Sequence, residues 1–163
     1  MQDGYDKAAV LAEHGASPAI EALQSALPAA LLDAKFDHGE LTLKIAREYI
    51  RTAAALLQKS GYNFLEDVTC VDYYPIEPRF QVIYHILSLS LKARVRLAVP
   101  VDSIDLEIDS IVPVWPSADF YEREVFDLFG IRFAGHPNLR RIMMPDEWEG
   151  YPLRKDYPVE GYR

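Results

Sequence analysis

Three consecutive strand-like stretches constrain the fold of this chain more than any other feature of its sequence. They span residues 64–74, 80–89 and 92–99. The middle stretch is largely apolar or aromatic, as a central strand of a sheet would be. In the third stretch polar and apolar side chains alternate, so Arg94 and Arg96 fall on the face opposite Val95. Adjacent strands of this kind predict a sheet that buries one of its faces.

Upstream of these stretches, the sequence pattern predicts helices and a β-hairpin. The helices span residues 5–14, 17–27 and 46–60, and the hairpin joins 31–36 to 41–45. Ser17 is placed to be an N-cap with Pro18 at the first helical position, and Gly61 stands where a C-cap glycine would. We therefore expect an α+β fold, with one mixed β-sheet and helices packed on one side.

The composition excludes several classes of function. The chain has 163 residues, 50% of them hydrophobic, and a formal charge of −8, which argues against nucleic acid as the main partner. Cys70 is the only cysteine, so an internal disulfide, an all-cysteine zinc site and an iron–sulfur cluster held by this chain are excluded. There is no apolar run long enough to span a bilayer and no export signal at the acidic start. We expect a soluble protein of a reducing compartment.

The charge is divided unevenly along the chain. The last 32 residues, 132–163, hold six basic and five acidic residues, whereas the preceding part carries −9. This final segment is rich in aromatic residues but has no helical or strand period, which indicates that it lies on a surface. Fully extended, it would reach roughly 110 Å. We therefore expect a domain at residues 1–130 and an extended C-terminal arm at 131–163 that lies on a partner.

A cluster of charged residues lies on the helix predicted at residues 117–129, which Ser117 would cap and Gly130 would end. The cluster consists of Glu122, Arg123, Glu124 and Asp127. On local evidence a solvated helix face is the favoured interpretation, ahead of a buried structural network and of acid–base catalysis by the carboxylates. No glycine-rich phosphate loop, nucleophile motif or paired metal-ligand spacing completes an active site.

The remaining candidate residues favour structural roles. His136 lies in a Gly-His-Pro-Asn run that is typical of a turn histidine with local hydrogen bonds, and Cys70 lies within a predicted strand, where burial is the default. The basic pairs of the arm could bind phosphate, but the aromatic residues beside them favour protein contact. These pairs are Arg140–Arg141 and Arg154–Lys155.

The stretch from Glu122 to Met143 is too specific for a generic helix and turn. It reads EREVFDLFGIRFAGHPNLRRIM, and it strongly resembles the signature of the C subunit of the proton-translocating NADH–quinone oxidoreductase, the thirty-kilodalton subunit of respiratory complex I. Residues 115–118, 149–158 and 68–74 also resemble that family. The resemblance is clear from about residue 60 to the end, whereas the chain upstream of that point carries little of it.

The resemblance implies a structural subunit that binds no cofactor and takes part in catalysis only within the whole complex. The arm would lie over the forty-nine-kilodalton quinone-site subunit (the D subunit), near the iron–sulfur subunits, while flavin and clusters are carried by other chains. The complex would lie at the cytoplasmic face of the bacterial cell membrane, with this chain attached through its partners. The acids of the signature helix would pair with arginines, either of a partner or of the arm itself, namely Arg132, Arg140 and Arg141.

Two alternatives remain open from the sequence. The chain could be the homologous subunit of a related complex, such as a membrane-bound hydrogenase or an F420-type dehydrogenase. It could instead be a stand-alone hydrolase that uses the carboxylates of Glu122, Glu124 and Asp127.

Overall fold

The computed structural model describes residues 4–160. The acidic start at residues 1–3, and Tyr162 and Arg163 of the predicted arm, lie outside the described residues. Within the described part, no helix is both long enough and apolar enough to cross a membrane.

A five-stranded mixed sheet forms the centre of the molecule, in the order β1-β2-β5-β4-β3. Its strands are β1 (Leu31–Asp37), β2 (Glu40–Ile45), β3 (Phe64–Asp72), β4 (Phe80–Ser88) and β5 (Ala93–Val101). Neighbouring strands are antiparallel except β2 and β5, which are parallel because the chain returns to β2 only after a helix and the β3–β4 hairpin. The predicted hairpin and all three predicted strands are present.

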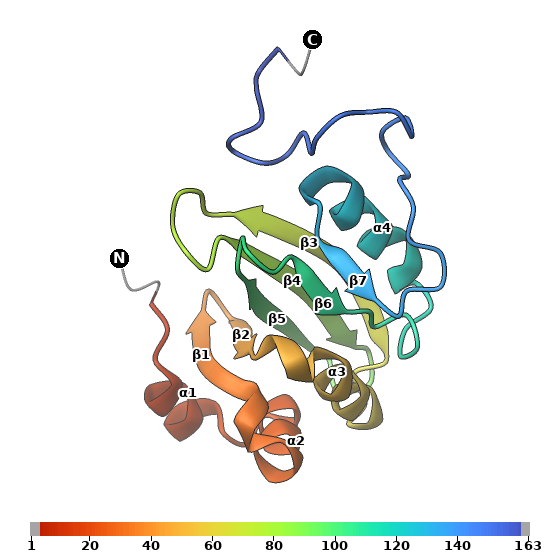
Figure 1. Cartoon of the computed structure of the whole chain (residues 1–163). Helices are drawn as coiled ribbons and strands as arrows, with labels where there is room; N and C mark the ends of the chain where they lie inside the picture. The colour runs from red at the N-terminus through yellow and green to blue at the C-terminus, as the bar shows by residue number, and fades with distance from the viewer. Residues whose placement is uncertain (1–3, 161–163) are drawn as a thin grey trace.

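The helices cover one face of this sheet (Figure 1). They are α1 (Lys7–His14), α2 (Pro18–Ala26), α3 (Ile50–Lys59), α4 (Ala118–Phe129) and the short 3-10 helices η1 (Pro28–Ala30) and η2 (Arg47–Tyr49). Inward-facing residues of the central strands, such as Val82, Tyr84 and Leu97, are buried beneath them. The opposite face is open and forms a cleft of about 820 Å³. The predicted fold class, α+β with helices on one side of a mixed sheet, is confirmed.

Two details differ from the expectations. Ser17 and Ser117 occupy the N-cap positions of α2 and α4, but neither side chain makes a capping hydrogen bond there. The helix predicted from residue 46 begins as η2 and becomes α-helical only at Ile50. Helix ends are commonly of the 3-10 type, and sequence periodicity does not distinguish the two.

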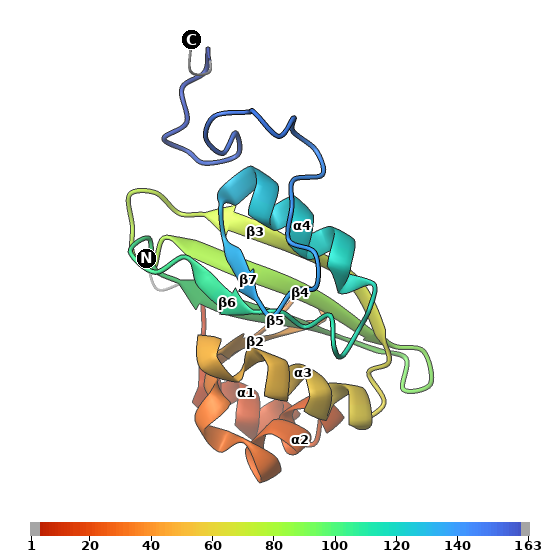
Figure 2. The same cartoon turned by 45° about the vertical axis from the view of Figure 1, so that its right-hand side comes forward.

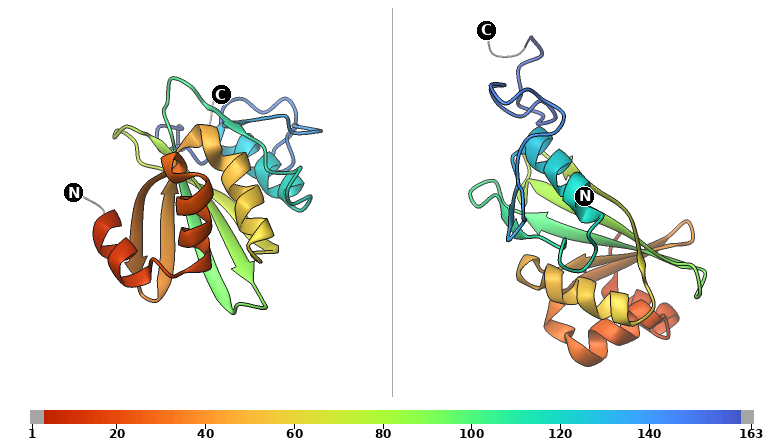
Figure 3. Two further views of the ribbon diagram at one scale, coloured as in Figure 1. Left: turned by 90° about the horizontal axis from the view of Figure 1, so that it is seen from below. Right: turned by 90° about the vertical axis from the view of Figure 1, so that its right-hand side faces the viewer.

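A second, two-stranded sheet joins the last part of the chain to the body. Strand β6 (Glu107–Asp109) pairs in parallel with β7 (Arg132–Ala134), beside α4 (Figure 2). Ile131 and Phe133 are buried with the core, so packing continues past the boundary at residue 130 that the sequence predicts. Beyond β7 the chain passes along α4 and then leads away from the sheet (Figure 3).

Candidate functional site

The charged residues of α4 are divided between its buried and exposed faces. Glu122 and Asp127 are 0% exposed and Arg123 is 8% exposed, whereas Glu124 lies in solvent. The favoured interpretation of a solvated face is therefore wrong for three of the four residues. The structure supports a buried network instead, in which each buried group is paired with an opposite charge or hydrogen-bonded.

Asp127 binds the main chain of the segment that follows β7. One carboxylate oxygen accepts three backbone N–H groups at 2.7–2.9 Å, and the other accepts Arg141 Nη1 at 2.7 Å. The three N–H groups belong to Ile142, Met143 and Met144. One carboxylate thus satisfies three consecutive peptide groups that have no secondary structure to bond to.

These contacts decide the protonation state of Asp127. Its burial acts to raise the pKa, but the three N–H groups and the Arg141 guanidinium outweigh that effect and hold the pKa below its usual value. The carboxylate is ionised at neutral pH, with its hydrogen-bonding capacity directed to this chain. It is a structural anchor.

Arg123 holds the same segment from the preceding turn of the helix. Its Nε and Nη2 atoms donate to the carbonyl oxygens of Arg140 and Arg141 at 3.2 and 3.3 Å. Within residues 4–160 the Arg140 side chain makes no ion pair, and Arg132 pairs with Glu107 at 3.6 Å. Of the three arm arginines expected to pair with signature-helix acids, only Arg141 does so within the described chain.

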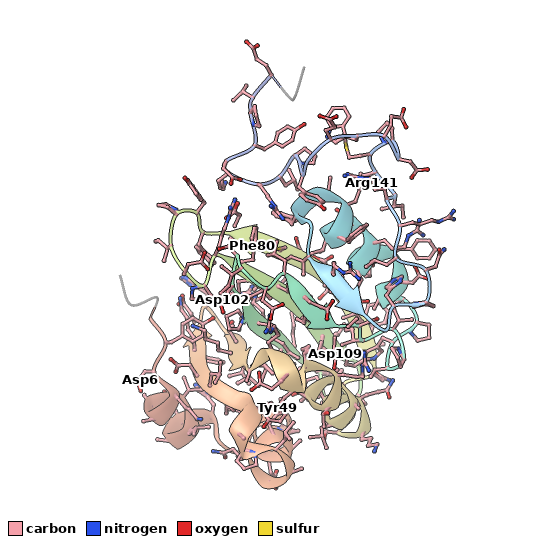
Figure 4. The ribbon with its side chains drawn as sticks, in the orientation of Figure 1. Asp6, Tyr49, Phe80, Asp102, Asp109 and Arg141 are labelled. Atoms are coloured by element: carbon pink, nitrogen blue, oxygen red, sulfur yellow. The ribbon has the colours of Figure 1, made fainter. Side chains whose placement is uncertain are left out.

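The C-terminal end of α4 is capped by the segment that follows β7. Gly130 has φ of +78°, which ends the helix as expected, and Arg154 Nε donates to the carbonyl oxygen of Phe129 at 2.7 Å. The Arg154 guanidinium lies over the rings of Phe80 and Tyr151. A cation on the last carbonyls of a helix opposes the negative end of its dipole. Figure 4 shows Phe80 and Arg141 on either side of this end of the helix.

An ion-pair network that the sequence does not signal holds residues 155 and 156 of the same segment. Arg79 donates to Asp72 at 2.8 and 2.9 Å and to Asp156 at 2.6 and 3.0 Å, and Asp72 also accepts the backbone N–H of Lys155. Burial acts to raise the pKa of Asp72, but Arg79 and the backbone donors lower it to about 2. Lys155 therefore contributes to this network through its backbone N–H.

Glu122 lies in a different environment from Asp127. Its carboxylate accepts Ser110 Oγ at 2.6 Å and the N–H of Ile111 at 2.7 Å, which ties α4 to the chain after β6. Burial dominates these contacts and raises the pKa of Glu122 to about 7. No cation lies within ion-pair distance of it among residues 4–160, and the buried Tyr84 hydroxyl has no hydrogen-bond partner there.

His136 and Cys70 are placed as the sequence indicates. His136 Nδ1 accepts the N–H of Asn138 at 3.0 Å, and its Nε2 lies 3.2 Å from the carbonyl oxygen of Asp119. Cys70 is buried in β3, and burial raises the pKa of its thiol. Both side chains are occupied in local structure.

Comparison with known proteins places this site in a family. The family model for the 30 kDa subunit of respiratory-chain NADH dehydrogenase matches residues 43–163. The chain belongs to this family. It is 46% identical over 144 residues to the C subunit of the NADH-quinone oxidoreductase of Citrifermentans bemidjiense, covering 88% of this chain and 89% of the relative. It is 46% identical over 145 residues to the same subunit of Geobacter sulfurreducens, covering 88% and 90%.

Solved structures carry the same fold. The trypsin-resistant fragment (1–134) of Nqo5 matches with a TM-score of 0.67 and 32% identity, covering 75% of this chain and 99% of the fragment. A chain of the membrane-bound sulfane sulfur reductase, an archaeal respiratory membrane complex, matches with a TM-score of 0.73 over 94% of this chain and 87% of its own length. At 23% identity this second match shows the fold alone.

As a member of the 30 kDa family, the chain is a subunit of the NADH–quinone oxidoreductase and takes part in an enzyme as one component of that complex. Among the described residues, no group of three or more histidine, cysteine, aspartate or glutamate side chains could hold a metal ion. The geometry around α4 instead serves to hold one segment of the chain against another.

Proposed function

We propose that this chain is a cofactor-free scaffold of the quinone module, in which α4 holds the root of a C-terminal arm that lies on a partner. The partner is the forty-nine-kilodalton quinone-site subunit (the D subunit), with the iron–sulfur subunits of the peripheral arm close by. Flavin and iron–sulfur clusters belong to other chains, and electron transfer from NADH to quinone and proton pumping belong to the whole complex.

The capture of the arm's main chain by α4 is the observation that supports this proposal. Asp127 and Arg123 contact five consecutive residues, 140–144, almost entirely through peptide groups. A buried carboxylate that carries this many bonds is costly to assemble, and removing one member of such a network typically costs about 3–5 kcal/mol. The contacts set the direction in which the rest of the arm leaves the domain.

The same contacts argue against the hydrolase alternative. Asp127 is held ionised by its donors, Glu122 is enclosed between a hydroxyl and a peptide N–H, and Glu124 stands apart in solvent. The cleft of about 820 Å³ lies on the open face of the sheet and is lined by residues of other elements. The three carboxylates do not converge on a substrate-sized space.

A subunit of a related complex is the second candidate, because the archaeal respiratory complex contains a chain of the same fold. The relatives at 44–46% identity are named as NADH-quinone oxidoreductase subunits, which favours the first candidate. Neighbouring genes distinguish the two, since NADH- and flavin-binding subunits would accompany one and nickel-site subunits the other. For either complex we place the chain at the cytoplasmic face of the bacterial cell membrane, attached through its partners.

Limited proteolysis with trypsin tests the proposed arm. We expect slow cleavage after Arg140, Arg141, Arg154 and Lys155 in the free chain, when the anchoring contacts open transiently, and protection once the quinone-site subunit is bound. The trypsin-resistant Nqo5 fragment corresponds to 75% of this chain, which supports a sensitive remainder. Equal cleavage in both states would contradict the arm's placement.

Turnover of the assembled complex tests the scaffold role. Glu124→Gln and Arg140→Met change side chains that are exposed here, so we expect an effect on assembly alone. If either variant assembles normally but stops quinone reduction, a role in electron or proton coupling has to replace the scaffold.

A further inference from the structure

The arm contains a closed loop whose shape is fixed within this chain. Asp127 holds the N–H groups at its start, and Arg141 joins its two ends by donating both to Asp127 and to the carbonyl oxygen of Gly150, at 2.7 and 3.1 Å. Inside the loop, the N–H of Trp148 donates to the carbonyl oxygen of Pro145 at 3.0 Å. Residues 142–149, called here the 142–149 loop, are therefore held by main-chain contacts.

Because the anchors use peptide groups, large apolar side chains of this loop are left outside. Met143 is 62% exposed and Trp148 is 38% exposed, and Ile142 is also exposed. Tryptophan is among the residue types that dominate interface energies, and methionine is enriched at interfaces. A loop that is already ordered loses less conformational entropy when such side chains bind a partner.

The charge around these side chains is negative, although the arm as a whole is slightly basic. Asp146, Glu147 and Glu149 are exposed and make no ion pair within residues 4–160. Of the basic groups beside the loop, Arg141 is used on Asp127 and Arg154 on the end of α4, whereas Arg140 and Lys155 are exposed outside the loop and make no ion pair within residues 4–160. What the loop offers to a neighbour is thus apolar at Met143 and Trp148 and acidic around them.

We propose that the 142–149 loop is a preformed docking element. It binds an apolar pocket, bordered by arginine or lysine, on a neighbouring subunit of the complex. This inference rests on the proposed scaffold function and adds the chemistry of the contact. Charge complementarity selects the basic border, since like charges facing an interface are repelled and opposite charges steer association. Met143 and Trp148 enter the pocket, and the carboxylates set the orientation.

Competition for incorporation tests this. Tagged full-length variants are co-expressed with the untagged wild-type chain in its host, the complex is isolated through another subunit, and the ratio of tagged to untagged chain is measured by mass spectrometry. We expect Met143→Ala combined with Trp148→Ala to lower the ratio at least tenfold, because loss of an interface hot spot commonly changes affinity by more than that. The charge reversal Glu147→Lys with Glu149→Lys should lower it similarly.

A matched control lies in another exposed loop. Ile104→Ala and Asp102→Lys change an apolar and an acidic exposed side chain outside the 142–149 loop, and their ratios should stay within twofold of the tagged wild type. Thermal unfolding of each purified variant establishes that it folds. If Trp148→Ala lowers the melting temperature, Met143→Ala and the charge reversal decide the matter, since these side chains are exposed.

Each outcome has a distinct meaning. Loop variants that incorporate as well as tagged wild type overturn the docking element, and a charge reversal that improves incorporation overturns the basic border. Self-association of the free chain that the same loop variants abolish would assign the loop to a second copy and also overturn the proposal. Absence of the tagged wild-type chain from the isolated complex would instead refute the scaffold function itself.

Discussion

Replacing Asp127 with asparagine removes the anchor on which the arm depends. The asparagine side chain has one oxygen and one NH₂ group, so a donor must face either the three N–H groups or the Arg141 guanidinium. The change also leaves Arg141, whose side chain is largely buried, without its counter-charge. Shape is conserved, so the effect reports the loss of charge and hydrogen bonds.

The structure sets the size of this effect. Breaking a buried ion pair by removing one partner costs about 3–5 kcal/mol, and bonds to a charged group contribute roughly 1.5–3 kcal/mol each. Because the contacts are shared by one carboxylate they do not add fully. We therefore expect a loss of about 3–5 kcal/mol in the opening free energy of residues 142–144, which corresponds to roughly two to four orders of magnitude in hydrogen-exchange protection.

Hydrogen exchange of the Ile142, Met143 and Met144 amides measures this directly. The Asp127→Asn variant should lose protection there, while Glu124→Gln on the exposed face of the same helix should match the wild type. In the folded chain the pKa of Asp127 lies below the 3.8 of the unfolded chain. The difference between wild type and variant is therefore present above about pH 4 and is lost as the pH falls through the folded value. Protection within threefold of wild type at pH 7 would refute the anchor.

Three further perturbations have defined outcomes. The pKa of Glu122 is about 7 in the folded chain and 4.5 in the unfolded chain, so ionisation of Glu122 opposes folding. In urea titrations, the unfolding free energy of wild type relative to Glu122→Gln should fall by about 2–3 kcal/mol from pH 5 to 8. A difference that stays constant with pH would contradict this. Gly130→Ala places a Cβ 2.5 Å from Arg154 at a residue with positive φ. The change should lower the free energy of unfolding by about 1–2 kcal/mol in thermal unfolding and speed tryptic cleavage after Arg154. Unchanged cleavage would show that Gly130 does not position the segment around Arg154. Arg79→Met leaves the buried Asp72 carboxylate without its ion-pair partner, and should lower the free energy of unfolding by about 3–5 kcal/mol at pH 7. This difference in unfolding free energy should disappear in acid as Asp72 is protonated. A loss under about 1 kcal/mol at pH 7 would show that the network is dispensable.

Periodicity was sufficient to predict most of the fold. The alternation of Arg94 and Arg96 with Val95 reflects a strand with one buried face, and the structure places these residues accordingly in β5. Gly130 marks a helix end because a left-handed residue there is rarely anything but glycine. These are local signals, carried by neighbouring residues, and a single sequence contains them.

The burial of Glu122 and Asp127 in α4 could not be predicted from such local signals. An acidic helix face looks alike whether it meets water or peptide N–H groups, and the donors to Asp127 are main-chain groups that carry no side-chain signal. The network of Arg79 with Asp72 and Asp156 joins residues 7 and 77 positions apart, a separation that no periodic pattern spans. The resemblance to a known family marked α4 as important, but not what its residues touch.

Because α4 holds the arm by its main chain, folding and partner recognition depend here on different groups, whereas in most proteins the same side chains serve both. An N–H group is present at every residue except proline, so positions 142–144 can exchange one side chain for another and still be held by Asp127. Selection acting on the outward side chains is then free to follow changes in a neighbouring subunit without disturbing the fold. We therefore expect that grafting the corresponding three residues of a distant relative, provided none is proline, leaves the domain intact while changing which assembly accepts it.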